Sequence, residues 1–148
     1  MRLSRDISQI HLSQQQLEEM VRYCDEQPDV LALYVYGSYG TAYQTPFSDV
    51  DLAVLPVPGA HWDLDRELEV HSRLSNIGRS DDINVINLRV VPVTLQFRVL
   101  ETGRALYVRD REALADFTAS TIVRHADFAP DLAAFYRDWD AALREEFL

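Results

Sequence analysis

Two short apolar segments, each with a polar end, constrain the fold of this 148-residue chain most strongly. Residues 34–38 read YVYGS and residues 48–55 read SDVDLAVL, with ten residues between Ser38 and Asp49. Both segments have the β-branched, aromatic and apolar composition of buried strands. Successive side chains of a strand point to opposite faces, so Asp49 and Asp51 share one face. The sequence therefore predicts two carboxylates side by side at the start of a buried strand.

Paired carboxylates beside a glycine–serine turn indicate chemistry on phosphates. Two neighbouring carboxylates repel each other unless a cation lies between them, and Mg²⁺ takes oxygen ligands that it shares with substrate phosphates. Gly37 allows close approach of the backbone, and Ser38 adds a hydroxyl donor to the exposed N–H groups of the turn. We predict metal-dependent nucleotidyl transfer, with Asp49 and Asp51 as catalytic metal ligands and with Gly37 and Ser38 holding the outer phosphates.

The order Gly-Ser, spacer, Asp-x-Asp resembles the signature of the nucleotidyltransferase superfamily related to DNA polymerase β. The ten-residue spacing is similar to that of the minimal nucleotidyltransferases, which are commonly the antitoxin partners of HEPN-domain RNase toxins in two-gene modules. The resemblance runs from about Leu31 to Tyr107. It implies an α/β (α+β) nucleotidyltransferase fold, in which helices flank a small mixed sheet and a helical tail follows.

The resemblance also implies a function. The chain is expected to be an ATP- and Mg²⁺-dependent adenylyltransferase, an antitoxin of the MntA type that transfers AMP to a tyrosine hydroxyl of its cognate HEPN toxin. Two alternatives stay open: a catalytically weak protein that neutralises the toxin by binding it, and a minimal transferase that acts on a small molecule. Either a homo-oligomer or a hetero-oligomer is compatible with the sequence.

A third carboxylate usually completes such a site, where it binds metal and helps to deprotonate the attacking hydroxyl. By the resemblance, Asn84 occupies the position of that aspartate, and Asp82 lies two residues earlier, about 6–7 Å away on the same strand face. An amide can ligate a cation but cannot accept a proton. We predict that Asp82 takes the catalytic and metal-binding role, with a chain lacking this charge as the alternative. The loop after Ser38 carries no charge, which leaves Arg79 or Arg98 as the arginines to consider for the nucleotide. An ordinary surface role explains each of them better.

Charge and composition exclude several other classes. A net charge of −10 argues against tight, sequence-independent binding to nucleic acid, since that needs clustered Lys and Arg. A single cysteine, Cys24, excludes an internal disulfide. No segment has the length and apolarity of a membrane span, and the first residues lead into no apolar signal core, so we expect a cytoplasmic protein.

The spacing of apolar residues, together with capping residues, glycines and prolines, predicts the remaining helices and strands. A helix should begin after Ser13, whose hydroxyl and Gln16 form a capping box. Strands are expected at 30–36, 49–55, 82–88 and 105–108. One helix should run from about 63 to 77 and end at Gly78. The β-branched run at 90–94 would by itself permit a strand, and it is the resemblance that implies a helix from Pro92 to about 100, ended by Gly103. The inward face of the first of these helices is predicted to hold Leu64, Leu68, His71, Leu74 and Ile77.

The chain divides into a nucleotidyltransferase core at 1–108 and a helical extension at 109–148. Pro130 should interrupt or kink the extension, because a proline inside a helix removes one hydrogen bond and clashes with the preceding turn. We predict two helices joined near residues 126–130. Phe128, Phe135, Tyr136 and Trp139 are candidates for helix packing or for contact with a partner.

Overall fold

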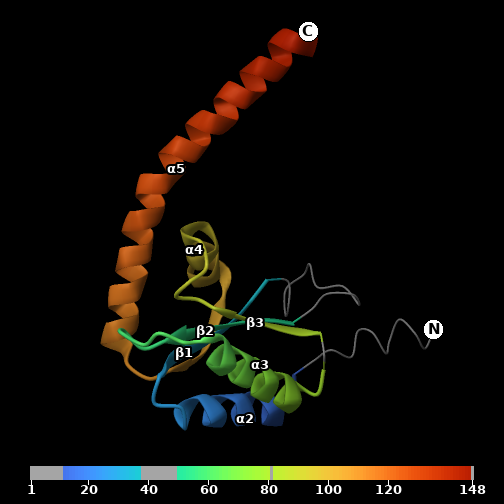
Figure 1. Cartoon of the computed structure of the whole chain (residues 1–148), viewed down its shortest axis with the longest axis vertical. Helices are drawn as coiled ribbons and strands as arrows, with labels where there is room; N and C mark the ends of the chain where they lie inside the picture. The colour runs from blue at the N-terminus through green and yellow to red at the C-terminus, as the bar shows by residue number, and fades with distance from the viewer. Residues whose placement is uncertain (1–11, 38–49, 81, 148) are drawn as a thin grey trace, which may run out of the picture.

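The computed structural model has a four-stranded sheet with helices on both faces, and a long C-terminal helix that runs beyond the body (Figure 1). The structure describes residues 12–37, 50–80 and 82–147, with side chains of the last helix described as far as Phe128 and at Arg137. In chain order the elements are α2 (Gln14–Asp25), β1 (Val30–Tyr36), β2 (Val50–Pro56), α3 (Leu64–Gly78), β3 (Ile83–Asn87), α4 (Val93–Thr102), β4 (Arg104–Val108) and α5 (Arg111–Phe147). The predicted mixed sheet flanked by helices is confirmed.

The strands lie in the order β3-β2-β1-β4, so the two strands of the motif are central. β1 runs antiparallel to both of its neighbours, whereas β2 and β3 run parallel and are joined through α3. Central strands are covered on both faces, and this explains why β1 and β2 are apolar almost throughout. Any polar side chain near the ends of these strands is therefore held by a rigid, buried scaffold.

Side chains from the two faces of the sheet form two separate cores. Under α2 and α3 the sheet contributes every second residue of β2, namely Val50, Leu52 and Val54. The opposite face, with Ala53 and Leu55, packs against α4 and the first part of α5. By this alternation Asp51 belongs to the α4 and α5 face, at the start of its strand.

Two details of α3 differ from the sequence prediction. Leu64 and Leu68 are 70% and 54% exposed rather than buried, while Val70 and Leu74 face the core. The first turns of α3 face inward through Arg66 instead, which forms an ion pair with Asp29 at 2.6 Å. An arginine stem covers apolar surface while its guanidinium pairs with the carboxylate, so the two leucines are left on the outer side.

The end of α3 also lies one residue later than predicted. Gly78 is the last helical residue, and Arg79 follows in the left-handed conformation with φ 54°. A Cβ on Gly78 would overlap Cδ1 of Ile83, so the glycine lets α3 pack closely on β3 without a shift of that side chain.

The predicted break in the C-terminal extension is wrong. α5 is one helix from Arg111 to Phe147 and continues through position 130. Figure 1 shows that its axis changes direction partway along, as α5 leaves the body. A proline costs a helix one hydrogen bond and bends it, but neighbouring turns can continue on both sides. No helix in the described part of the chain is both long enough and apolar enough to cross a membrane.

Candidate active site

Three neighbouring strands bring one polar residue each to the same row of the sheet. Asp51 is paired with Tyr36 of β1 on one side and with Asn84 of β3 on the other. Residues that are directly paired across a sheet have side chains on the same face, a few ångströms apart. The row lies where β1 ends and β2 begins, beside Gly37. This is the place at which the sequence predicts nucleotide chemistry.

Gly37 lies directly against the carboxylate of Asp51. Its φ is 78°, in the region that favours glycine, and a Cβ added to it would lie only 2.7 Å from Asp51 Oδ2. The backbone after β1 therefore turns away from the sheet within contact distance of this carboxylate. A side chain at position 37 would have to displace either the turn or the carboxylate. The glycine of the Gly-Ser turn and the second aspartate of the Asp-x-Asp segment therefore lie close together, and the absence of a side chain at position 37 makes room for the carboxylate.

Asn84 occupies the place beside Asp51 on β3. Its Nδ2 donates a hydrogen bond to Asp51 Oδ1 at 3.4 Å. An amide hydrogen bond stabilises the ionised form of the carboxylate, yet Asn84 itself carries no charge and takes no proton. At this row of the sheet, the described neighbour of Asp51 on β3 is therefore an amide rather than a second acid.

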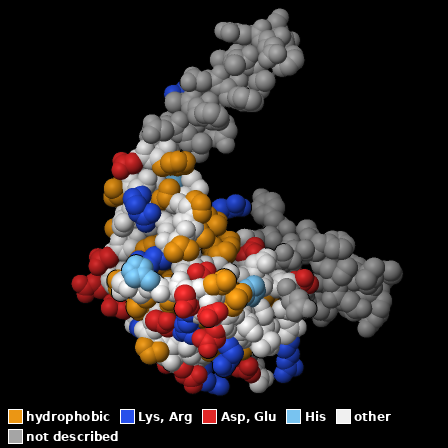
Figure 2. Space-filling model, in the orientation of Figure 1, with side chains coloured by type: hydrophobic (Ala, Val, Ile, Leu, Met, Phe, Trp, Pro, Cys, Tyr) orange, Lys and Arg blue, Asp and Glu red, His pale blue; other side chains and the backbone are white. Residues whose placement is uncertain are grey.

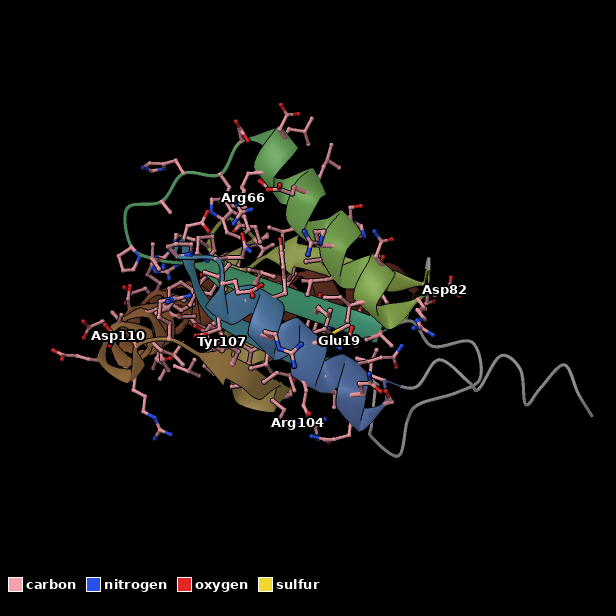
Figure 3. The ribbon with its side chains drawn as sticks, turned by 90° about the horizontal axis from the view of Figure 1, so that it is seen from below. Glu19, Arg66, Asp82, Arg104, Tyr107 and Asp110 are labelled. Carbon is pink, nitrogen blue, oxygen red and sulfur yellow. The ribbon has the colours of Figure 1, made fainter. Side chains whose placement is uncertain are left out.

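Asp82 lies just before β3, at the edge of the described molecule labelled in Figure 3. Its carbonyl accepts a hydrogen bond from the Val50 N–H at 3.1 Å, and its own N–H donates to Ser80 Oγ at 3.0 Å. These bonds fix the Asp82 backbone alongside the first residue of β2. The side chain is exposed to solvent, so it is accessible to a metal ion or a substrate.

Tyr36 and Arg98 extend the electrostatics of the site. Burial raises the pKa of the Tyr36 phenol, the negative charge of Asp51 raises it further, and the positive charge of Arg98 on α4 opposes them. The phenol therefore stays protonated at neutral pH and can act as a hydrogen-bond donor. Arg98 is one of the two arginines that the sequence leaves as candidates. The sequence predicts no role for Tyr36, whose only signal is its position before Gly37.

Ser38 and Asp49, two of the predicted site residues, lie outside the described residues. Among the residues that the structure describes, no three His, Cys, Asp or Glu side chains form a metal-binding group. The described oxygen donors are nevertheless of the right type for Mg²⁺, because carboxylate and amide oxygens are the hard ligands that this ion prefers. The carboxylate of Asp51 and the amide of Asn84 thus fit the ion that the motif implies.

Comparison with known proteins identifies the family. The family described as "Polymerase beta, Nucleotidyltransferase" matches residues 18–112, and the chain belongs to this family. The match includes β1, Gly37, Asp51 and β3, and so contains the whole row described above. No curated protein sequence matches the chain.

Solved structures share the fold. A chain of a toxin–antitoxin crystal structure with AMP-PNP superposes with a TM-score of 0.68 at 24% identity, covering 86% of this chain and 98% of that one. A tri-AMPylated Shewanella oneidensis HEPN toxin in complex with an MNT antitoxin gives 0.66 at 24% identity, covering 85% and 98%. The toxin–antitoxin complex MntA–HepT gives 0.66 at 20% identity, covering 85% and 97%.

Proposed function

We propose that this protein is an ATP- and Mg²⁺-dependent adenylyltransferase that acts as an antitoxin by transferring AMP to a tyrosine hydroxyl of a cognate HEPN toxin. The observation that carries the proposal is the contact of Gly37 with the Asp51 carboxylate at the end of the central strands, in a chain of the nucleotidyltransferase family. Complexes with AMP-PNP and with an AMPylated HEPN toxin among the similar structures support the choice of nucleotide and partner.

Asp49, Asp51 and Asp82 would hold Mg²⁺, which neutralises phosphate charge and aligns the attacking and leaving oxygens in such sites. The toxin hydroxyl attacks the α-phosphorus of ATP, the bond to pyrophosphate breaks, and the proton of the hydroxyl passes to a base. Asp82 is the proposed base, since it is exposed and Asn84 cannot accept a proton. Gly37 and Ser38 hold the outer phosphates as pyrophosphate forms.

The position of Asn84 favours one second candidate. If the amide beside Asp51 leaves the site one charge short, the chain neutralises its toxin by binding alone. A transferase acting on a small molecule is the remaining alternative, and no described feature favours it.

The C-terminal extension 109–148 is proposed to contact the toxin. Ile122, Val123 and Phe128 on α5 are 50%, 61% and 42% exposed, which is unusual for three large apolar side chains so close in sequence. Val123→Asp should weaken the complex at least about tenfold, since a charge in an apolar interface is left unpaired. Leu68→Asp, at an exposed leucine on the other side of the sheet, is the matched control and should leave affinity unchanged.

Mass spectrometry separates the candidates. Incubation with ATP, Mg²⁺ and the purified product of the neighbouring gene should add about 329 Da per transferred AMP to that partner, as expected for nucleotidyl chemistry at a two-metal site. The Asp51→Asn variant provides the control and should add none. A stable complex without any mass change would replace transfer with inhibition by binding. Transfer of AMP to a small molecule but not to the partner would contradict both antitoxin candidates and would favour a small-molecule transferase.

A further inference from the structure

Two arginines converge on a hollow at the other end of the sheet. The hollow has a volume of about 430 Å³ and lies between α4, α5 and the segments that follow β2 and β3. The residues that line it and carry the argument are Arg89, Gln96, Asp116, Phe117, Ser120 and Arg124. Pro56, at the far end of β2 from Asp51, binds Arg89. Pro56 lies five residues beyond Asp51 along the strand, or about 17 Å, so the hollow is separate from the nucleotide site.

Arg89 is held with its guanidinium facing this hollow. Its Nε and Nη2 both donate to the Pro56 carbonyl, at 3.1 and 2.6 Å, and its Cζ lies 5.2 Å from the centre of the Phe117 ring. Burial lowers the pKa of Arg89 from its usual value, which means that its charge is partly removed from water. The Nη1 group donates to nothing in the described part of the chain.

Arg124 is fixed by a chain of hydrogen bonds that starts at a buried amide. Gln96 is 3% exposed, and its Nε2 donates to the carbonyls of Leu88 and Arg89 at 2.9 and 3.2 Å. Its Oε1 is thereby directed to Arg124, whose Nη1 donates to it at 2.8 Å. Arg124 also donates to the hydroxyls of Ser120 and Thr121. An arginine has five N–H donors, so part of this guanidinium remains available.

Neither arginine is neutralised by a carboxylate within the described residues. Asp116 lines the same hollow, but the described ion pairs belong to Arg66, which binds Asp29 and Glu69. This is unexpected in a chain of net charge −10, where acidic side chains outnumber basic ones. Arg89 is half-buried, and a partly buried charge in a protein is normally paired. An unpaired Arg89, with the exposed Arg124 beside it at the same hollow, therefore points to a charge that comes from outside.

From this geometry we infer a second binding site, specific for an oxyanion, between Arg89 and Arg124. A phosphate or a carboxylate group placed there accepts hydrogen bonds from both guanidinium groups, and the planar fork of arginine suits either anion. The Ser120 hydroxyl can donate as well. Asp116 limits the charge that the hollow attracts and favours a ligand that also carries a hydroxyl or amine donor near its anionic group. Figure 2 shows basic side chains among the hydrophobic ones over this part of the molecule.

Calorimetric titration of the full chain tests the inference. The probes are inorganic phosphate, glycerol phosphate and glutamate, at constant ionic strength and with EDTA present so that metal-dependent binding near Asp51 does not contribute. Arg124→Gln should raise the dissociation constant at least about tenfold, the usual scale of a charge-assisted hydrogen bond. Arg22→Gln, at an exposed arginine of α2, is the control and should bind like the parent chain.

Two further readouts keep the test decisive. Asp116→Asn removes a like charge and should tighten binding, a gain that loss of folding cannot mimic. The side-chain amide resonance of Gln96 should shift on titration, because this amide touches Arg124 directly. If the two phosphates bind and glutamate does not, the ligand of the site is a phosphate. If only glutamate binds, the ligand is a carboxylate. Equal affinity in the parent chain and Arg124→Gln would overturn the site, whatever the outcome for AMP transfer.

Discussion

The two ends of the central strands carry opposite chemistry on one scaffold. At the start of β2 the described groups are the carboxylate of Asp51, the amide of Asn84 and the phenol of Tyr36. Beyond the end of the same strand, Arg89 and Arg124 face a hollow with positive charge in excess. A carboxylate end suits a cation that brings phosphates with it, whereas an arginine end suits an anion directly. One buried sheet therefore separates two kinds of charge that would otherwise neutralise each other.

The largest expected effect comes from exchanging one charged residue at each end. Asp51→Asn should lower the rate of AMP transfer by about 10³-fold or more, because a metal ligand stabilises charge in the transition state. Arg124→Gln should leave the transfer rate within about twofold, since about 17 Å of strand lies between the sites. Rates would be measured by the mass increase of the partner, and circular dichroism would check folding. Full activity of the Asp51→Asn variant would show that this carboxylate has no part in the transfer reaction.

The next prediction concerns which residue on the β3 side serves as the base. If Asp82 accepts the proton, Asp82→Asn should slow transfer by roughly 10²–10⁴-fold, the usual scale of general base catalysis. Asn84→Asp should then change little, or should disturb Asp51 by adding a like charge in direct register with it.

The opposite pair of results would identify a weakened enzyme. Tolerance of Asp82→Asn together with faster transfer by Asn84→Asp would show that position 84 is the base position and that the present amide lowers activity. Both variants should be compared in one assay with the same partner preparation.

A pair of glycines isolates the contact between the turn and Asp51. Gly37 and Gly59 both have positive φ, 78° and 86°, but a Cβ at Gly59 would meet nothing within 4 Å. Both alanine variants should lose about 1–2 kcal/mol of stability from the backbone conformation alone. Only Gly37→Ala should also reduce transfer, by about tenfold or more, because its Cβ displaces the Asp51 carboxylate. Equal activity in the two variants would mean that the turn tolerates a side chain.

The sequence was sufficient for the parts of the fold that depend on local chemistry. The Ser13 capping box is present, with Gln16 N–H bound to Ser13 Oγ at 3.1 Å, and β1 has the predicted bounds. Alternation also predicted that Asp51 lies on the strand face opposite to Val50 and Leu52, and these two side chains are buried in the core under α2 and α3. These features require only a few adjacent residues and a regular backbone.

The errors arose where distant contacts decide the outcome. Leu64 and Leu68 fit a helical apolar face, but Asp29, far away in sequence, draws Arg66 inward in their place. The paired arrangement of Arg89, Gln96 and Arg124 depends on the packing of α4 against α5, which no spacing in the sequence reveals. Pro130 predicted a break from local sterics alone, whereas α5 continues through it.

The smallest expected effect concerns Arg66, the arginine that does have a carboxylate partner near the arginine end. Burial alone would raise the pKa of Asp29, but the hydrogen bonds and charge of Arg66 outweigh it, so the net pKa is lowered. A carboxyl group whose pKa is lowered by folding stabilises the folded protein at pH values above its unfolded-state pKa of about 3.9. This stabilisation is lost as the pH falls through the pKa of the group in the folded state. Asp29→Asn should therefore cost up to about 1 kcal/mol at pH 7, since the pair is partly solvated, and the difference should shrink below about pH 4. Urea unfolding at both pH values measures it. A loss that stays constant with pH would assign the role of Asp29 to its shape rather than its charge, and would weaken the contrast between paired Arg66 and unpaired Arg89 and Arg124.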